Sequence, residues 1–192
     1  MRITGGQWRG RRLEAVKGLD VRPTTDRARE ALFNILRHEI EAAEVVDCCC
    51  GTGALGLEAL SRGARHVDFI DVSPRSLQTV RLNLERLAAA PTTFAVHRGD
   101  AARWLEKRLA AGAVDDLIVL ADPPYGGPVP DDLLSVLAAG TAPAVLVLEH
   151  PSQEALAVPE PERWRLDLRS YGSSAFTIIR PCEPDHPEHA DA

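Results

Sequence analysis

The residues best suited to chemistry are Asp122-Pro123-Pro124-Tyr125, which follow a short apolar run. The two prolines fix the backbone, so that carbonyl oxygens can point away from a preceding strand and into a cleft. The Asp122 carboxylate and a proline carbonyl are two acceptors for the two hydrogens of an exocyclic amine, an arrangement that turns the nitrogen lone pair toward a methyl group on sulfur. Tyr125 offers a face on which a purine can stack. A rigid turn would explain the prolines but not the flanking Asp and Tyr, so the segment indicates an amine-methylating site that works mainly by positioning.

A glycine motif, Gly51-Thr52-Gly53-Ala54-Leu55-Gly56, is typical of nucleotide-binding loops between a strand and a helix. Alone it favours a nicotinamide or flavin cofactor. However, Asp47 stands four residues before the first glycine, where a carboxylate would repel a pyrophosphate and attract a cationic ligand. S-adenosylmethionine is such a ligand, because it carries an ammonium and a sulfonium and no phosphate.

Two further acids follow expected strands. Asp71 can accept hydrogen bonds from ribose hydroxyls, and Asp100 together with the next backbone N–H could read an adenine edge. Each acid taken singly could instead cap the N-terminus of a helix. Three acids at successive strand ends favour a nucleoside-binding site.

The apolar pattern predicts the elements that must bring these segments together. Short apolar runs alternate with helical periodicity, which is typical of βα repetition. We expect strands at 44–48, 66–72, 93–97, 117–121 and 144–149, helices from about 25, through 55–60, from 74, at 101–110 and at 131–139, and two final strands at 164–169 and 175–180. This order predicts an α/β fold, a doubly wound sheet with helices on both faces and a C-terminal β-hairpin. Ligands bind at the carboxyl ends of the strands in such sheets.

Length and charge suggest how the chain is divided. The 192 residues are enough for one core. Residues 1–22 are expected to form a small basic β-hairpin, with strands at 2–8 and 11–16 and Gly10 at the turn. Residues 23–181 are expected to form the main domain, and residues 182–192 a disordered acidic tail.

The charge is distributed unevenly along the chain. Residues 1–40 carry nine Lys or Arg and five acids, whereas the net charge of the whole chain is −6. A basic arm on an acidic body suggests a face for a polyanion, although a solvated hairpin with ordinary surface arginines is an equal alternative.

Other classes find no support in the sequence. No apolar stretch is long enough to span a membrane, and no signal peptide is visible, so we expect a soluble cytoplasmic protein. The four cysteines, Cys48-Cys49-Cys50 and Cys182, have no zinc-binding spacing, and we expect no metal and reduced thiols.

At this point the sequence resembles the bacterial 16S rRNA guanine-N2 methyltransferase D family. The resemblance rests on Asp47 through Ala64 with its glycines, on Asp122-Pro123-Pro124-Tyr125, and on the N-terminal Arg2-Ile3-x-Gly5-Gly6-Gln7-Trp8-Arg9-Gly10-Arg11-Arg12-Leu13. Arg22-Pro23-Thr24-Thr25-Asp26-Arg27-x-Arg29-Glu30 and the closing Tyr171-Gly172-Ser173-Ser174-x-Phe176-Thr177 are also similar, so the resemblance covers about residues 1–181. Cys48-Cys49-Cys50 and Asp71, where a Glu is more usual, depart from the family pattern.

The resemblance implies a class I methyltransferase fold, S-adenosylmethionine as donor, and one guanine in 16S rRNA of the small ribosomal subunit as target. Apart from the resemblance, we expect a monomer. The implied donor-binding residues are Asp47, Gly51, Gly53, Leu55, Asp71, Val72, Asp100, Ala101 and Thr25, the last in a segment with Thr24 and Arg29 that closes over the donor. Asp122, Pro123, Pro124 and Tyr125 would hold the target base, and Arg9, Arg11 and Arg12 would contact RNA phosphates.

Three alternatives remain. A DNA or protein amino-methyltransferase could use the same tetrapeptide, although the chain has no target-recognition domain of the usual size for DNA modification. An RNA-binding relative without catalysis would have no use for the complete set of acids and glycines. A dehydrogenase would have no role for Asp47 or for Asp122 to Tyr125.

Overall fold

The computed structural model describes residues 1–16, 25–112, 115–137 and 142–182. Arg22, Pro23 and Thr24, and the expected acidic tail from residue 183 onward, lie outside the described residues. The proposed division of the chain at residues 22 and 181 therefore stays a prediction.

The helices and strands coincide with the expected ones to within about two residues. They are α1 (Asp26–Ile35), β1 (Glu44–Cys48), α2 (Ala54–Ser61), β2 (His66–Asp71), α3 (Pro74–Arg86), β3 (Phe94–Arg98), α4 (Ala101–Ala110), β4 (Leu117–Ala121), α5 (Val129–Leu137), β5 (Val145–Pro151), β6 (Trp164–Tyr171) and β7 (Ser174–Pro181), with short 3-10 turns at Pro91–Thr93 and Pro161–Arg163. Helix α5 begins two residues earlier than expected, at Val129, since Pro130 is compatible with a first helical turn.

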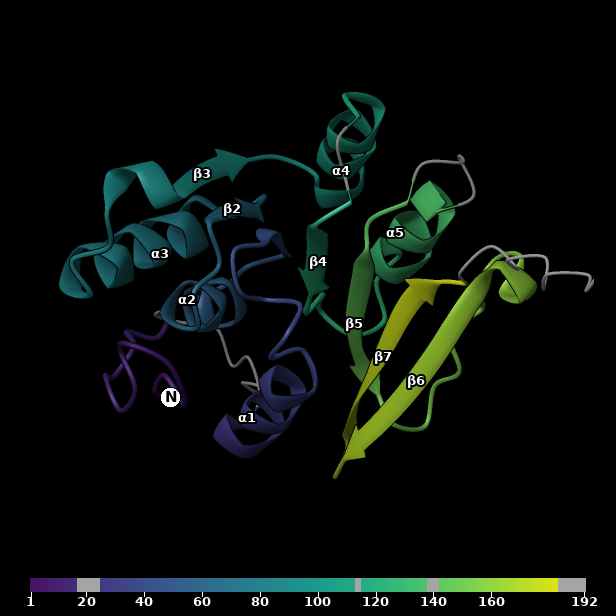
Figure 1. The fold of residues 1–192 in the computed structure, drawn as a ribbon, viewed down its shortest axis with the longest axis horizontal. Helices are drawn as coiled ribbons and strands as arrows, with labels where there is room; N and C mark the ends of the chain where they lie inside the picture. The colour runs from purple at the N-terminus through teal and green to yellow at the C-terminus, as the bar shows by residue number, and fades with distance from the viewer. Residues whose placement is uncertain (17–24, 113–114, 138–141, 183–192) are drawn as a thin grey trace, which may run out of the picture.

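The seven strands form one sheet in the order β3-β2-β1-β4-β5-β7-β6 (Figure 1). Strands β1 to β5 are parallel, and β7 runs antiparallel between β5 and β6. The strand order reverses between β1 and β4, the place where doubly wound sheets open a crevice for ligands. The predicted α/β fold with its C-terminal hairpin is confirmed.

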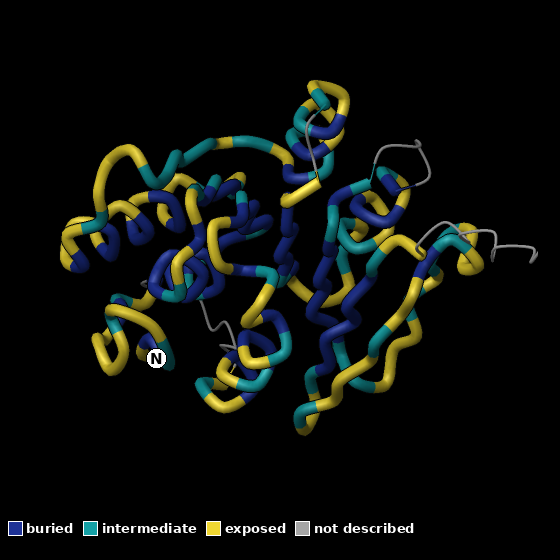
Figure 2. The backbone as a smooth tube through the Cα atoms, viewed as in Figure 1, coloured by how far each residue is buried: buried dark blue, intermediate teal, exposed yellow. Residues whose placement is uncertain are grey.

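Two apolar clusters fill the space between the sheet and its helices. Helices α1, α2 and α3 cover one face, through side chains such as Phe33, Leu57 and Val80. Helices α4 and α5 cover the other, through side chains such as Leu105 and Leu133. In Figure 2 the central strands are buried along their length, whereas β6 at the edge is largely exposed.

Among the described residues, the helices are too short or too polar to cross a membrane.

The N-terminal hairpin is shorter than expected. Residues 1–3 pair antiparallel with residues 10–13, through the Arg2–Arg12 bridge and a bond of 2.9 Å from the Ile3 N–H to the Arg11 carbonyl, with Gly10 at the turn, but the strands do not extend over 2–8 and 11–16. The backbone N–H groups of Thr4 and Gly5 instead donate to the Glu58 carboxylate, each at 2.8 Å. Side chains that would have faced solvent in an isolated hairpin, Ile3 and Leu13, are buried in the core beside α1 and α2.

Candidate active site

The sequence-predicted site residues meet at the carboxyl ends of the parallel strands. Cys48 at the end of β1 pairs with Ile70 of β2 on one side and with Ala121 of β4 on the other. The next residues along these strands are Cys49, Asp71 and Asp122. The loops after β1, β2 and β4 therefore leave the sheet side by side, as the sequence predicted.

The loop after β1 turns through three left-handed residues. Cys49, Gly51 and Gly53 have φ values of 57°, 52° and 78°. A Cβ at Gly51 would meet only the Cys49 carbonyl oxygen, at 3.9 Å, so this glycine leaves open space above the loop. The third glycine of the motif has a packing task instead, because a Cβ at Gly56 would lie 2.4 Å from the Phe69 ring. The first glycine is thus free to face a ligand, whereas the last lets α2 approach β2.

Asp47 lies beneath this loop and is 1% exposed. Its Oδ2 accepts a hydrogen bond of 2.9 Å from the Gly56 N–H in the first turn of α2. Burial raises the pKa of Asp47 well above its ordinary value, nearby Asp122 and Asp71 raise it further, and only the Gly56 bond opposes the shift. Asp47 thus anchors the helix, and its direct contact with a ligand stays a prediction.

Asp71 ties three loops together. Its Oδ2 accepts from the Gly51 N–H at 2.9 Å and its Oδ1 from the Ser73 N–H at 2.7 Å. Its backbone carbonyl accepts from the Gly99 N–H in the loop after β3. Each carboxylate oxygen retains a second lone pair, which a ribose hydroxyl could use.

The remaining donor-binding candidates divide into capping and lining positions. Asp100 is exposed and caps α4 by accepting from the Arg103 N–H at 2.9 Å, and Thr25 caps α1 by accepting from the Ala28 N–H at 3.1 Å. Ala101 and Leu55 are buried. Val72 is 64% exposed, so the loop after β2 has an apolar surface against which a flat ring could pack.

The pKa of the Cys49 thiol reflects the acids that lie around it. Burial raises the pKa of its thiol to about 12, and the charges of Asp71, Asp47, Asp122 and Asp100 add to the shift. One side chain at the centre of the loop therefore feels all four acids. The crevice is electronegative, as expected for a site that binds a cation rather than a phosphate.

Asp122-Pro123-Pro124-Tyr125 begins where β4 ends. Asp122 is half-buried and Pro123 buried, whereas Pro124 is exposed and Tyr125 is 51% exposed. The Tyr125 hydroxyl shares a hydrogen bond of 3.0 Å with Ser174 Oγ at the start of β7. The C-terminal hairpin thus holds the aromatic ring at the crevice.

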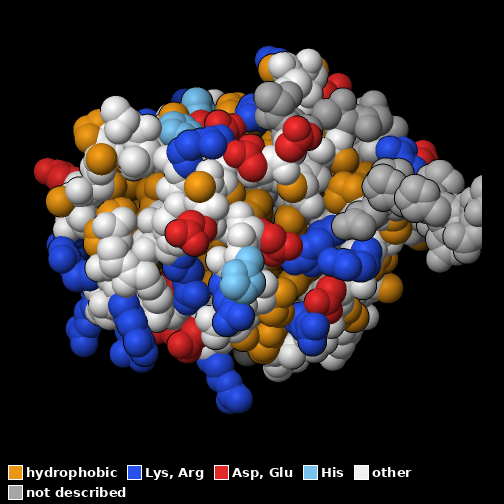
Figure 3. All heavy atoms as spheres, in the orientation of Figure 1, with side chains coloured by type: hydrophobic (Ala, Val, Ile, Leu, Met, Phe, Trp, Pro, Cys, Tyr) orange, Lys and Arg blue, Asp and Glu red, His pale blue; other side chains and the backbone are white. Residues whose placement is uncertain are grey.

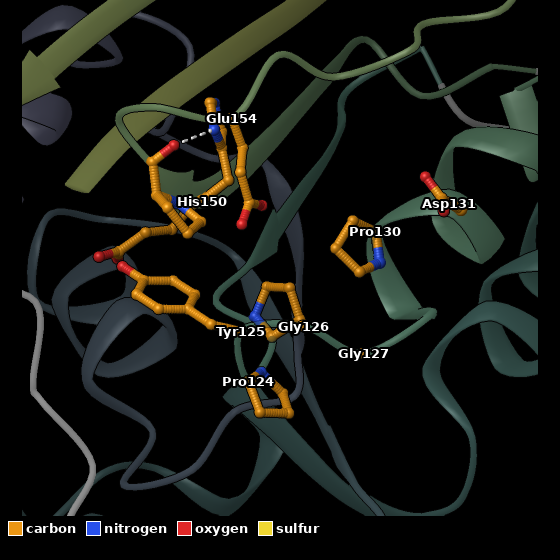
Figure 4. A pocket seen from close by; sticks show the side chains of 11 residues that line it. Pro124, Tyr125, Gly126, Gly127, Pro130, Asp131, His150 and Glu154 are labelled. Carbon is orange, nitrogen blue, oxygen red and sulfur yellow. Dashed lines mark hydrogen bonds between the residues drawn. The ribbon is translucent and has the colours of Figure 1, made fainter. Parts of the chain in front are cut away.

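A pocket of about 110 Å³ lies beside this motif, and its lining includes residues that sequence reasoning missed. From β5 come Glu149 and His150, which are both 2% exposed. The His150 Nε2 shares a hydrogen bond of 2.8 Å with Thr177 Oγ1 on β7. In Figure 4, Tyr125 and His150 lie on one side of the pocket, and Pro130 and Asp131 of α5 on the other. The only sequence signal for Glu149 and His150 was that these two ionisable residues follow the apolar residues 145–148 in β5.

The basic N-terminal residues Arg9, Arg11 and Arg12 are exposed. The Arg11 guanidinium donates to the Arg86 carbonyl at the end of α3, at 2.7 Å. Figure 3 shows Lys and Arg side chains gathered over the region of the N-terminal loop and α1. Arg9, Arg11 and Arg12 thus form a positively charged edge on the N-terminal loop.

Arg29 lies elsewhere than the family resemblance suggested. Its side chain is fully buried, and its Nε lies 3.4 Å from Glu58 Oε2. It also donates to Asp26 and to the Arg2 carbonyl. It therefore joins α1 and the N-terminal loop to α2 rather than facing the crevice.

Comparison with known proteins agrees with this geometry. The family model described as conserved hypothetical protein 95 matches residues 1–180. The ribosomal RNA small subunit methyltransferase D of Escherichia coli K12 is 39% identical over 137 residues, which are 71% of this chain and 66% of that protein. The protein of the same name from Haemophilus influenzae is 31% identical over 169 residues, 86% of either chain. The chain thus spans about two thirds of the Escherichia coli relative.

Solved structures are similar over nearly the whole chain. An Escherichia coli structure provisionally described as a methyltransferase, yhhF, is 33% identical with a TM-score of 0.76, covering 94% of this chain and 97% of that one. A Thermus thermophilus protein, TTHA0928, is 27% identical with a TM-score of 0.76, covering 94% and 99%. Since the family model matches nearly the whole chain and the solved structures share its fold, the chain belongs to the family described as conserved hypothetical protein 95, that of the small-subunit rRNA methyltransferases D, and has their S-adenosylmethionine-dependent methyltransferase fold.

Proposed function

We propose that this protein transfers a methyl group from S-adenosylmethionine to the exocyclic N2 of one guanine in 16S rRNA, within the small ribosomal subunit. The observation that carries the proposal is the position of Asp122 to Tyr125, which leave β4 beside the glycine loop of β1. An amine held there would lie next to the place where a donor bound above Gly51 presents its methyl group.

The residues present fit S-adenosylmethionine. Gly51 leaves open space above its loop. The loops 49–53, 71–73 and 99–101 contribute Asp71 and Asp100 and contain no Lys or Arg, so they suit a cation better than a pyrophosphate. Exposed Val72 offers an apolar contact for adenine, beside the Asp71 carboxylate that would hold the ribose. When bound, S-adenosylmethionine supplies an electrophilic methyl group on a positively charged sulfur.

The chain itself orients the amine. The Asp122 carboxylate and the Pro123 carbonyl accept the two N2 hydrogens and keep the nitrogen lone pair pointed at the donor side of the crevice. Tyr125, held by Ser174, stacks on the guanine ring. The amine sheds one proton as its new bond to carbon forms, and Asp122 is placed to accept it. Most of the rate then comes from orientation and charge.

RNA would approach over the basic N-terminal edge. Arg9, Arg11 and Arg12 are exposed and suited to phosphate contacts. An enzyme with this substrate would act as a monomer in the cytoplasm. The family relatives that act on the small subunit support an rRNA substrate over DNA or protein.

The test is methyl transfer from labelled S-adenosylmethionine to small subunits from a strain lacking this protein, with naked 16S rRNA and duplex DNA alongside. The expected product is N2-methylguanosine on the subunit, identified by nucleoside analysis. Label on DNA or on protein alone would show that the substrate is not 16S rRNA. Donor binding without any transfer would favour a non-catalytic RNA-binding protein.

A further inference from the structure

Glu149 is the residue of β5 that is next in register to Asp122. Ala121 of β4 pairs with Leu148 of β5, so the residues that follow, Asp122 and Glu149, stand at the same level on adjacent parallel strands. Side chains alternate along a strand, and Leu120 and Val147 belong to the same core cluster. Asp122 and Glu149 continue this face, on which Asp47 of β1 also lies. The register of β4 and β5 therefore places the two acids at neighbouring strand ends, and Glu149 lines the pocket with Pro123, the residue after Asp122.

The environment of Glu149 sets it apart from the other acids near the motif. It is 2% exposed, and it lines the pocket with Pro123 and Tyr125. Glu154 and Asp131 line the same pocket but are exposed at its rim. A carboxylate withdrawn from water forms stronger and more selective hydrogen bonds than one at a rim, because water does not compete for them. Glu149 is therefore the acid of this pocket best placed to recognise a base.

We propose that Glu149 determines specificity for guanine by accepting a hydrogen bond from guanine N1–H, while Asp122 holds the adjacent N2 amine. This inference rests on the proposed guanine-N2 activity. In guanine, N1–H and the N2 amine are neighbouring donors on the Watson–Crick edge, so two neighbouring carboxylates complement them. In adenine, the ring nitrogen next to the exocyclic amine carries a lone pair, which a carboxylate repels. Asp-Pro-Pro-Tyr alone recognises an amine, and Glu149 adds the choice of base.

The test uses a base that keeps the amine and lacks the N1 proton. Once the target position has been mapped, small subunits are reconstituted from 16S rRNA carrying either guanine or 2-aminopurine at that position. The wild-type protein is expected to methylate guanine about tenfold or more faster than 2-aminopurine, since the purine leaves the carboxylate facing a lone pair. Equal rates on the two substrates would overturn the proposal without any variant.

Glu149→Gln then tests the residue. The Gln amide N–H can donate to the unprotonated N1 of 2-aminopurine, so the preference for guanine should fall by about tenfold or more, chiefly in kcat/KM. Glu154→Gln, the same change at the rim of the same pocket, should keep the wild-type ratio. Donor affinity is measured for both variants by calorimetry to show that the donor site is intact.

An unchanged preference for guanine in Glu149→Gln would reject the role of Glu149. If the rates on both substrates also fell equally while donor binding was retained, Glu149 would have a structural task instead. Failure of the proposed function gives a different result, because the wild-type protein would then form no N2-methylguanosine on guanine-containing subunits.

Discussion

Arg29 and Glu58 form an ion pair whose side chains are both fully buried, with Nε 3.4 Å from Oε2. The Glu58 carboxylate also accepts from Arg62 Nε at 2.8 Å and from the backbone N–H groups of Thr4 and Gly5. One carboxylate thus fastens α1, α2 and the N-terminal loop to each other. Removing it takes the Glu58 acceptor from a buried guanidinium, which keeps its bonds to Asp26 and the Arg2 carbonyl, and leaves the backbone N–H groups of Thr4 and Gly5 without this acceptor.

Glu58→Ala should therefore lower the free energy of unfolding by about 3–5 kcal/mol, the usual cost of breaking a buried pair. Urea unfolding followed by circular dichroism measures the loss. The control is Asp116→Ala, which breaks the exposed bridge to Arg65 and should cost less than about 1 kcal/mol. Similar losses in the two variants would contradict this role for Glu58.

Asp122→Ala should abolish methyl transfer, with a loss of at least about a hundredfold in kcat, while donor affinity stays within a few-fold. The reason is that Asp122 holds the amine rather than the donor. Single-turnover transfer to small subunits and donor titration by calorimetry measure the two quantities separately. An active Asp122→Ala protein would show that another group accepts the amine hydrogens.

Asp47→Asn should stabilise the free protein at neutral pH. The pKa of Asp47 is raised above its ordinary value of 3.8, so the folded protein binds the proton more tightly than the unfolded chain. The contribution of Asp47 to stability then falls as pH rises above this ordinary value toward the folded pKa. Asn carries no charge, and its side-chain oxygen can still accept from Gly56.

The gain is expected at pH 7, where the unfolded chain carries the ionised carboxylate and burial opposes that charge in the folded protein. It should vanish on acidification below the ordinary pKa of Asp, and urea unfolding across this pH range measures it. The same variant should bind S-adenosylmethionine more weakly, because a negative charge near the donor is lost. A variant that is less stable than wild type at every pH would contradict the prediction.

Replacing Arg9, Arg11 and Arg12 together with Gln should weaken RNA binding and flatten its dependence on salt. Roughly one unit of slope in log affinity against log salt is lost per phosphate contact. Fluorescence anisotropy with labelled 16S rRNA fragments at several salt concentrations gives the slope. Arg169→Gln, on exposed β6, is the matched control. A triple variant with the wild-type slope would exclude the N-terminal edge as the RNA-binding face.

The cysteines beside the glycine loop should resist alkylation. Burial raises the pKa values of Cys48 and Cys50, and that of Cys49 reaches about 12, so few thiolates form at pH 8. Iodoacetamide should label exposed Cys182 first, at least about tenfold faster than the other three, as read by peptide mass spectrometry. Cys182→Ser should lose the fast phase. Rapid labelling of Cys49 in the folded protein would contradict the raised pKa.

The positions of helices and strands could be predicted because each has local signals. Ser73 caps α3 and Pro74 occupies its first turn, as their order in the sequence indicates. The uninterrupted apolar run Leu117–Ala121 is a central strand buried along its length. Both signals lie within a few residues of the element that they mark.

The length of the N-terminal strands was mispredicted for the opposite reason. The hairpin forms at residues 1–3 and 10–13, yet the backbone donors of Thr4 and Gly5 pair with Glu58, more than fifty residues away. No local pattern identifies such a partner.

In the candidate site, too, residues with local signals were predicted and long-range contacts were not. The acids and glycines after β1, β2 and β4 were found because successive parallel strands end at one edge of the sheet. The contacts Tyr125–Ser174 and His150–Thr177 were not, because they depend on β7 pairing with β5. A pattern of two consecutive strands predicts a hairpin but does not state which of its strands joins the sheet.

The place of β7 between β5 and β6 has a consequence for biosynthesis. Synthesis runs from the N-terminus, so β5 and β6 leave the ribosome before the strand that joins them. Until residues 174–181 emerge, the apolar strand Val145–Pro151 keeps one edge without its partner, and such edges readily pair with other chains. The nascent protein therefore presents an unpaired apolar edge until β7 is made, and a chaperone that covers this edge would protect it from aggregation.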